Sequence, residues 1–158
     1  MASTYTPIAT TTASSASSVT FSSIASTYTD LVCIVQVANS TNTDLGIRFN
    51  GDTGSNYSVT LLTGNGSSAA STRYSNQGEI YLDITGTQTG QMTYIVNVQN
   101  YSNTTTYKTT LTRYSNAGVA AEASVGLWRS TSAINSVTIK NGVGTFTGQV
   151  TLYGIKAA

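Results

Sequence analysis

The chain has 158 residues, within the usual range of a single domain, and seven Lys and Arg against six Asp and Glu give it a net charge of +1. Charged residues make up 8% of the sequence, far below the usual value of about 25%, and 29 Thr and 21 Ser fill much of the difference. Disorder requires low hydrophobicity together with high net charge, so this composition excludes a disordered chain. The basic residues are scattered, and no apolar stretch approaches the roughly 20 residues of a membrane span, so we predict neither nucleic-acid binding nor a transmembrane segment.

The N-terminal residues 1–17 are small and polar and contain the only proline, Pro7. They lack the basic and apolar regions of a secretory signal. Two interpretations stay open: a flexible lead-in, or an extended arm that lies on a neighbouring subunit and is anchored by Tyr5 and Ile8. We therefore divide the chain into an N-terminal arm or lead-in, residues 1–17, and one β-sandwich domain, residues 18–158.

From residue 18 onward, short runs rich in apolar residues and β-branched Thr recur with turn signals between them, which is typical of an antiparallel sandwich or barrel. Within one such run Ile80, Leu82 and Ile84 would share one face of a strand. The continuously apolar run 31–35 predicts a central strand covered on both faces. The predicted strands are 18–24, 30–37, 45–50, 57–63, 79–84, 92–101, 107–114, 124–129, 134–140 and 149–155.

Three Asn-Gly pairs mark predicted tight turns, because both residue types tolerate the positive φ angles that such turns need. They are Asn50-Gly51, Asn65-Gly66 and Asn141-Gly142, and the last one predicts a hairpin into residues 143–147. At most, residues 117–123 could form one helical turn. The predicted fold is all-β: a single antiparallel β-sandwich of jelly-roll type with an extended N-terminal arm.

The sequence gives little indication of catalysis, because it contains no histidine, which is the commonest general base and metal ligand. The single Cys33 lies in an apolar run and is expected to be a buried structural thiol. Around Asp52, the Gly-rich loop lacks the further oxygen ligands of a calcium site. We expect the carboxylates to be solvated at strand ends, loops and outward faces, so we predict no catalytic pair, no metal and no cofactor. These carboxylates are Asp30, Asp44, Asp52, Glu79, Asp83 and Glu122.

Ten tyrosines are the most suggestive feature of the composition. A surface that stacks on sugars or contacts other subunits would use the apolar ring and polar tip of Tyr, while ordinary strand propensity is the favoured explanation for any single residue. Trp128, beside Arg129, fits a core or a subunit interface. The predicted contact residues are Tyr5, Ile8, Tyr81, Trp128 and Tyr153.

Several segments resemble stretches that recur in structural proteins of tailed phages, especially marine and cyanobacterial phages. The resemblance covers nearly the whole chain and is weakest over residues 71–90. The segments that carry it are RFNGDTGSNYS (48–58), LLTGNGSS (61–68), NYSNTTTYKT (100–109), GLWRSTSAINSVTI (126–139) and TLYGIKAA (151–158).

The resemblance implies a virion protein with a β-sandwich fold and a trimeric state, and it carries over no catalytic residue. It implies backbone-geometry roles for Gly51, Gly54 and Gly154, and packing roles for Trp128 and Tyr153.

The function expected first is a capsid decoration or cement protein that acts as a homotrimer on the capsid exterior and binds the major capsid protein. The alternative is the head of a tail fibre that recognises a host surface glycan, which the tyrosines and the long polar loop 63–77 favour. A sugar-degrading enzyme is disfavoured by the missing histidine. Either virion role places the protein on the capsid exterior or the tail, after synthesis in the host cytoplasm.

Overall fold

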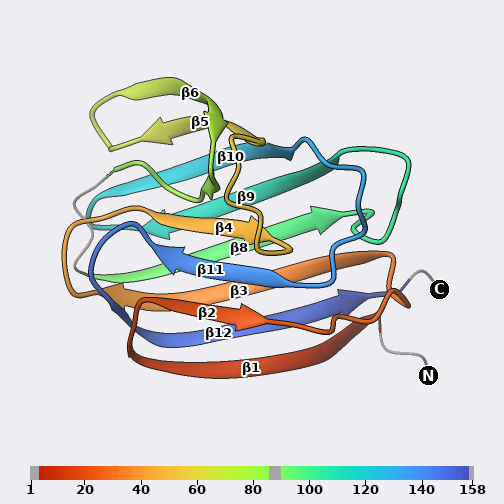
Figure 1. Ribbon diagram of the computed structural model, residues 1–158. Helices are drawn as coiled ribbons and strands as arrows, with labels where there is room; N and C mark the ends of the chain where they lie inside the picture. Colours follow the sequence, from red (N-terminus) through yellow and green to blue (C-terminus); the bar gives the residue numbers. More distant parts are fainter. Residues whose placement is uncertain (1–3, 86–89, 157–158) are drawn as a thin grey trace.

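The computed structural model of this protein describes residues 4–85 and 90–156. These residues form two antiparallel β-sheets (Figure 1). The described residues contain strands and no helix, so none of them forms a helix that could cross a membrane. The strands are β1 (Tyr5–Ala16), β2 (Ser18–Phe21), β3 (Asp30–Asn39), β4 (Leu45–Phe49), β5 (Tyr57–Gly64), β6 (Ala69–Gln77), β7 (Ile80–Tyr81), β8 (Gln91–Gln99), β9 (Lys108–Asn116), β10 (Ala120–Trp128), β11 (Val137–Asn141) and β12 (Phe146–Ile155).

The large sheet has the strand order β1-β12-β3-β8-β9-β10-β5-β6, and the small sheet has the order β2-β11-β4-β7. The chain passes repeatedly between the two sheets, and the small sheet packs on one face of the large one (Figure 1). This confirms the predicted all-β sandwich.

The core lies between the sheets and follows from the alternation of apolar residues along the strands. In β8, Met92, Tyr94, Val96 and Val98 are all fully buried, while the residues between them are only partly buried. The small sheet contributes buried residues such as Ile47, and the two sheets share one continuous apolar cluster. Cys33 lies in this cluster, as predicted, and burial raises the pKa of its thiol to about 12.

The N-terminal segment differs from the expected arm. Strand β1 is an edge strand of the large sheet and pairs with β12 of its own chain, from Tyr5 opposite Ile155 to Ala16 opposite Phe146. Residues 5–16 are therefore part of the sandwich, and the predicted boundary between residues 17 and 18 separates two strands of one domain. Alternation did not reveal β1 because an edge strand of small residues buries few apolar side chains: only one of its twelve residues is fully buried.

Three further predictions about local structure are wrong. The long polar loop predicted over residues 63–77 is wrong, since residues 69–77 form strand β6, which was missed because it is a second edge strand without a buried residue. Residues 117–123 form a turn and the start of β10 instead of a helical turn. The chain does turn after Asn141, but β11 belongs to the small sheet and β12 to the large one, so they do not form a hairpin.

The turn at Asn50-Gly51 is confirmed. Both residues have positive φ, 53° and 67°, and the Asp52 N–H donates to the Phe49 carbonyl at 3.0 Å, as in a type I′ turn. Gly154 has a different role from the one expected. Its φ is not positive, but a Cβ there would lie 2.3 Å from the Tyr28 ring, so close packing requires the glycine.

Candidate interaction surface

The outer face of the large sheet is the broadest regular surface of the molecule, and we call it the open face. It consists of the strand residues that point away from the small sheet. Strand register aligns them in rows across all eight strands of the large sheet. Its two central rows are Pro7, Tyr153, Val32, Asn97, Leu111, Val125, Thr60 and Arg73, and Thr10, Thr151, Ile34, Ile95, Arg113, Ala123, Leu62 and Ser71.

Large apolar side chains are exposed on this open face. Leu111 on β9 lies opposite Val125 on β10, and these side chains are 45% and 56% exposed. Leu62 on β5 lies opposite Ala123 and is 61% exposed. Exposed apolar residues are ordinary when they are scattered, but neighbouring ones form a patch of the kind that marks interaction sites.

A shallow hollow of about 510 Å³ lies on the same face. Leu62, Ile95 and Arg113 line it together with Ala121 and Ala123, whose short side chains leave the space open. The face therefore combines protruding apolar side chains with an apolar depression, a shape that another protein surface can fill.

Few charges point to the open face. Among the described strand residues, Asp30, Arg73 and Arg113 are the charged members of its rows. Asp30 belongs to β3, whereas Arg113 is on β9 and Arg73 is on β6, so the two signs of charge lie on different halves of the sheet. Little desolvation of ions would accompany the covering of this face.

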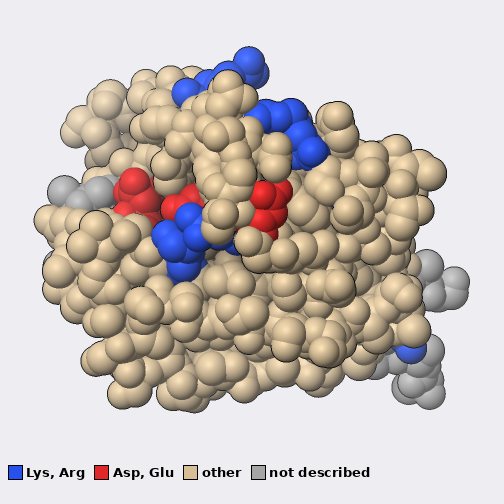
Figure 2. All heavy atoms as spheres, viewed as in Figure 1, with Lys and Arg blue, Asp and Glu red and all other residues tan. Residues whose placement is uncertain are grey.

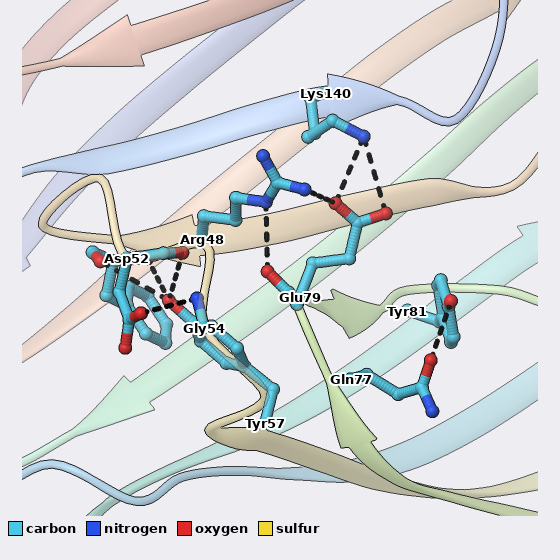
Figure 3. A network of polar contacts seen from close by, with 10 residues as sticks. Arg48, Asp52, Gly54, Tyr57, Gln77, Glu79, Tyr81 and Lys140 are labelled. Carbon is cyan, nitrogen blue, oxygen red and sulfur yellow. Dashed lines mark hydrogen bonds and ion pairs between the residues drawn. The ribbon is translucent and has the colours of Figure 1, made fainter.

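The opposite face of the molecule, formed by the small sheet, has a different character. Figure 2 shows one mixed group of acidic and basic side chains near the centre of that side, further basic side chains along the upper edge and at the lower right, and large uncharged areas between them. At the centre of this group, Glu79 accepts ion pairs from Arg48 at 3.2 Å and from Lys140 at 3.0 Å (Figure 3). Arg48 also donates to the Gly78 carbonyl, and Glu79 lies over Gly46, where a Cβ would be 2.7 Å from the carboxyl carbon. These contacts hold Glu79, which directly precedes β7, against β4 and β11.

Three carboxylates expected in solvent are buried. Glu79 is 8% exposed, Glu122 is 5% exposed and Asp83 is fully buried. Only Ile80–Tyr81 of the predicted strand 79–84 form a regular strand. Glu79 and Asp83 lie outside it, so the predicted alternation of inward and outward side chains does not apply to them. The Asp83 carboxylate accepts from the Leu45 N–H at 2.9 Å, and the Glu122 carboxylate accepts from the Ile84 N–H at 3.2 Å.

Burial raises the pKa of Asp83 to about 7; the Leu45 N–H opposes this, while the nearby Asp44 and Glu122 carboxylates add to it. Burial raises the pKa of Glu122 as well. Two carboxyl groups with elevated pKa are the kind of groups that act as general acids. Here Asp83 has no exposed surface through which a substrate could reach it. In the described part of the chain, no three His, Cys, Asp or Glu residues are grouped to hold a metal ion.

The predicted contact residues are distributed over different parts of the molecule. Tyr5 and Tyr153 come together at the β1–β12 edge of the open face, with their rings edge to face at 6.2 Å, and Tyr5 is 55% exposed. Ile8 is half-buried against the core. Tyr81 lies in the small sheet, where it packs on Tyr74 and donates to the Gln77 side chain.

The prediction that Trp128 is a surface contact is wrong. Its ring is buried in the core, stacked on Tyr57, and its indole Nε1–H donates to the Asp52 carboxylate at 2.7 Å. The tyrosines do not form one exposed platform either, since Tyr57, Tyr94, Tyr101 and Tyr114 are buried. Packing is therefore the main use of the aromatic residues, as the resemblance implied for Trp128.

Sequence reasoning missed the exposed apolar group of Leu62, Leu111 and Val125. The signal was present in β9 and β10, where apolar residues alternate with Thr and Ser, but the alternation alone does not indicate which of the two sets faces inward. No protein-family model matches this chain, and no curated protein is significantly similar to it in sequence.

Proposed function

We propose that this protein is a structural component of a tailed-phage virion, where it serves as a capsid decoration protein. In this role it assembles as a homotrimer on the capsid exterior and binds the major capsid protein, without enzymatic activity or a cofactor. The observation that carries the proposal is the open face: eight strands wide, poor in charge and studded with exposed apolar side chains.

A permanent structural contact suits such a face. Obligate interfaces are more apolar than transient ones, and uncharged Thr and Ser can pack without the cost of desolvating ions. The rest of the molecule also suits a rigid building block, because it is a single sandwich with one continuous core. The sequence resemblance to virion proteins supports the same role.

The head of a tail fibre that recognises a host surface glycan is the second candidate. The hollow beside Arg113 favours it, because an apolar depression with a polar donor at its rim can hold a sugar ring. The burial of four of the ten tyrosines weakens it, since those rings are not available to stack on sugars.

The location of the protein in the virion tests the proposal. Purified protein is mixed with empty, expanded capsids of the phage that encodes it, and binding is followed by co-sedimentation and by cryo-electron microscopy of the decorated shell. We expect saturable binding and density on the outer surface of the capsid. Label on tails alone, with binding to host glycans, would support the second candidate, and absence from the particle would refute both.

A further inference from the structure

The burial pattern of β9 and β10 is the reverse of the one expected for a sheet with its outer face in water. In the middle of these strands the polar residues Thr110, Thr112 and Ser124 face the small sheet and are 1–2% exposed. The apolar residues Leu111 and Val125 point the other way, into the open face.

This reversal is unfavourable in two ways, and only the exposure of the apolar side chains depends on whether the open face is covered. Hydroxyl groups buried without a hydrogen-bond partner destabilise the fold, and Thr110 Oγ1, Thr112 Oγ1 and Ser124 Oγ have none in the described part of the structure. Apolar side chains left in water contribute none of the stabilisation that their burial would give. An apolar outer side of a sheet is expected where another layer covers that side, as in sheets buried on both faces.

We propose that further copies of this chain cover the open face, so that this face is the self-association surface of the protein. The inference rests on the proposed function, in that it names the surface through which the decoration protein assembles. It also assigns the charged small-sheet side, with its Arg48–Glu79–Lys140 group, to the outside of the assembly.

The size of the face fits this assignment. Eight strands about 4.8 Å apart and about eight residues long make a surface of roughly 900 Å². A stable interface of standard size buries about 800 Å² on each partner. The open face alone therefore supplies the area that a stable assembly requires.

The distribution of charge favours a second copy as the occupant. The β1–β12–β3 half of the face carries Asp30, and the β9–β10–β5–β6 half carries Arg73 and Arg113. A copy that lays the first half of its face on the second half of its neighbour's face brings opposite charges together and adds no like-charge contact.

The test is the oligomeric state of Val125→Lys, measured by sedimentation velocity and light scattering over a wide range of protein concentration. The matched control is Val143→Lys, because Val143 is 70% exposed in the connection between β11 and β12, away from the open face. We expect the wild type and the control to sediment as multiples of the 16.5 kDa chain. A lysine in the middle of the interface should weaken self-association by at least about 100-fold, because burying an unpaired charge is costly.

Circular dichroism shows whether the Val125→Lys chain is folded, and Leu62→Lys, at a second exposed position, replaces it if it is not. A monomeric wild type, or folded variants that associate like the control, would overturn the inference. Capsid co-sedimentation separates it from the proposed function. A monomeric wild type that binds capsids refutes self-association only, whereas an associated protein that does not bind the phage particle refutes the decoration role only.

Discussion

The stability of this protein should fall as the pH rises from about 4 to about 7, because the buried Asp83 must ionise within the folded structure. Its ordinary pKa of 3.8 rises to about 7, chiefly through burial, and its side chain is fully buried. Between these two values the unfolded chain has lost its proton while the folded chain still holds it. The free energy of unfolding therefore decreases with pH across this window and levels off above it.

The size of the effect follows from the same values. A carboxyl group whose pKa rises from 3.8 to about 7 on folding destabilises the folded state by about 4 kcal/mol once it is ionised. Glu122, whose pKa is also raised by burial, adds to the effect in the same direction. Against a typical total stability of about 5–15 kcal/mol, such a loss is large.

Urea unfolding at a series of pH values between 4 and 8.5 measures this dependence, at one protein concentration because association would add to the apparent stability. In Asp83→Asn the slope should become much shallower, since the amide oxygen can still accept the Leu45 N–H and no charge is buried. Asp52→Asn is the control. Burial raises the pKa of Asp52, but the hydrogen bonds from Trp128, Asn56 and Gly54 together lower it by more. The contribution of Asp52 to stability is therefore lost only in more acidic solution. A wild type whose stability is flat or rises from pH 4 to 7, or an Asp83→Asn variant with the wild-type slope, would refute the reasoning.

Three other predictions concern the packing of the sandwich. Asp52→Ala should destabilise the protein by about 1.5–3 kcal/mol in urea unfolding, because it removes the charged acceptor of the Trp128 indole, and the fluorescence of this single tryptophan should change in the folded state. Cys33 should resist thiol reagents at pH 8 and react fully in denaturant, since burial raises its pKa to about 12; rapid modification of the native protein would contradict its place in the core. Gly154→Ala should cost about 1–3 kcal/mol, seen as a lower Tm, because the added methyl group overlaps the Tyr28 ring; an unchanged Tm would show that the ring can move aside.

Much of the sandwich could be predicted from alternation and turn chemistry because these are local properties. Strand β8 alternates without exception, and the Asn50-Gly51 pair adopts the positive φ angles that its residue types allow. Local alternation and turn chemistry could not predict the two edge strands. Strands β1 and β6 have little apolar periodicity, and hydrogen bonds to a neighbouring strand hold them in the sheet. Such pairing depends on where the neighbour ends up in space, which a local pattern does not specify.

The candidate site was harder to predict, because it depends on which face of a strand is buried. In β9 the set Thr110 and Thr112 and the set Leu111 and Arg113 alternate regularly, so the sequence indicates a strand but leaves its orientation open. In a sheet with one buried and one solvent-exposed face, the side of β9 that carries Leu111 would be expected to face inward. The neighbouring Tyr114 and Lys108 are on the same side as the threonines and are buried, so register fixes the opposite orientation.

The reversed orientation of β9 and β10 accounts for two features that are separately unfavourable. The exposure of Leu111 and Val125 is no longer unfavourable if the open face is an interface, since both side chains are then buried, as apolar residues normally are. The inward Thr and Ser side chains still carry the cost of their unpaired hydroxyls, but β-branched Thr retains a methyl group for the core and the strand propensity that the sheet requires. The sequence of these strands is thus better suited to a sheet covered on both faces than to a free monomer, and for that reason the oligomeric state is the property to measure first.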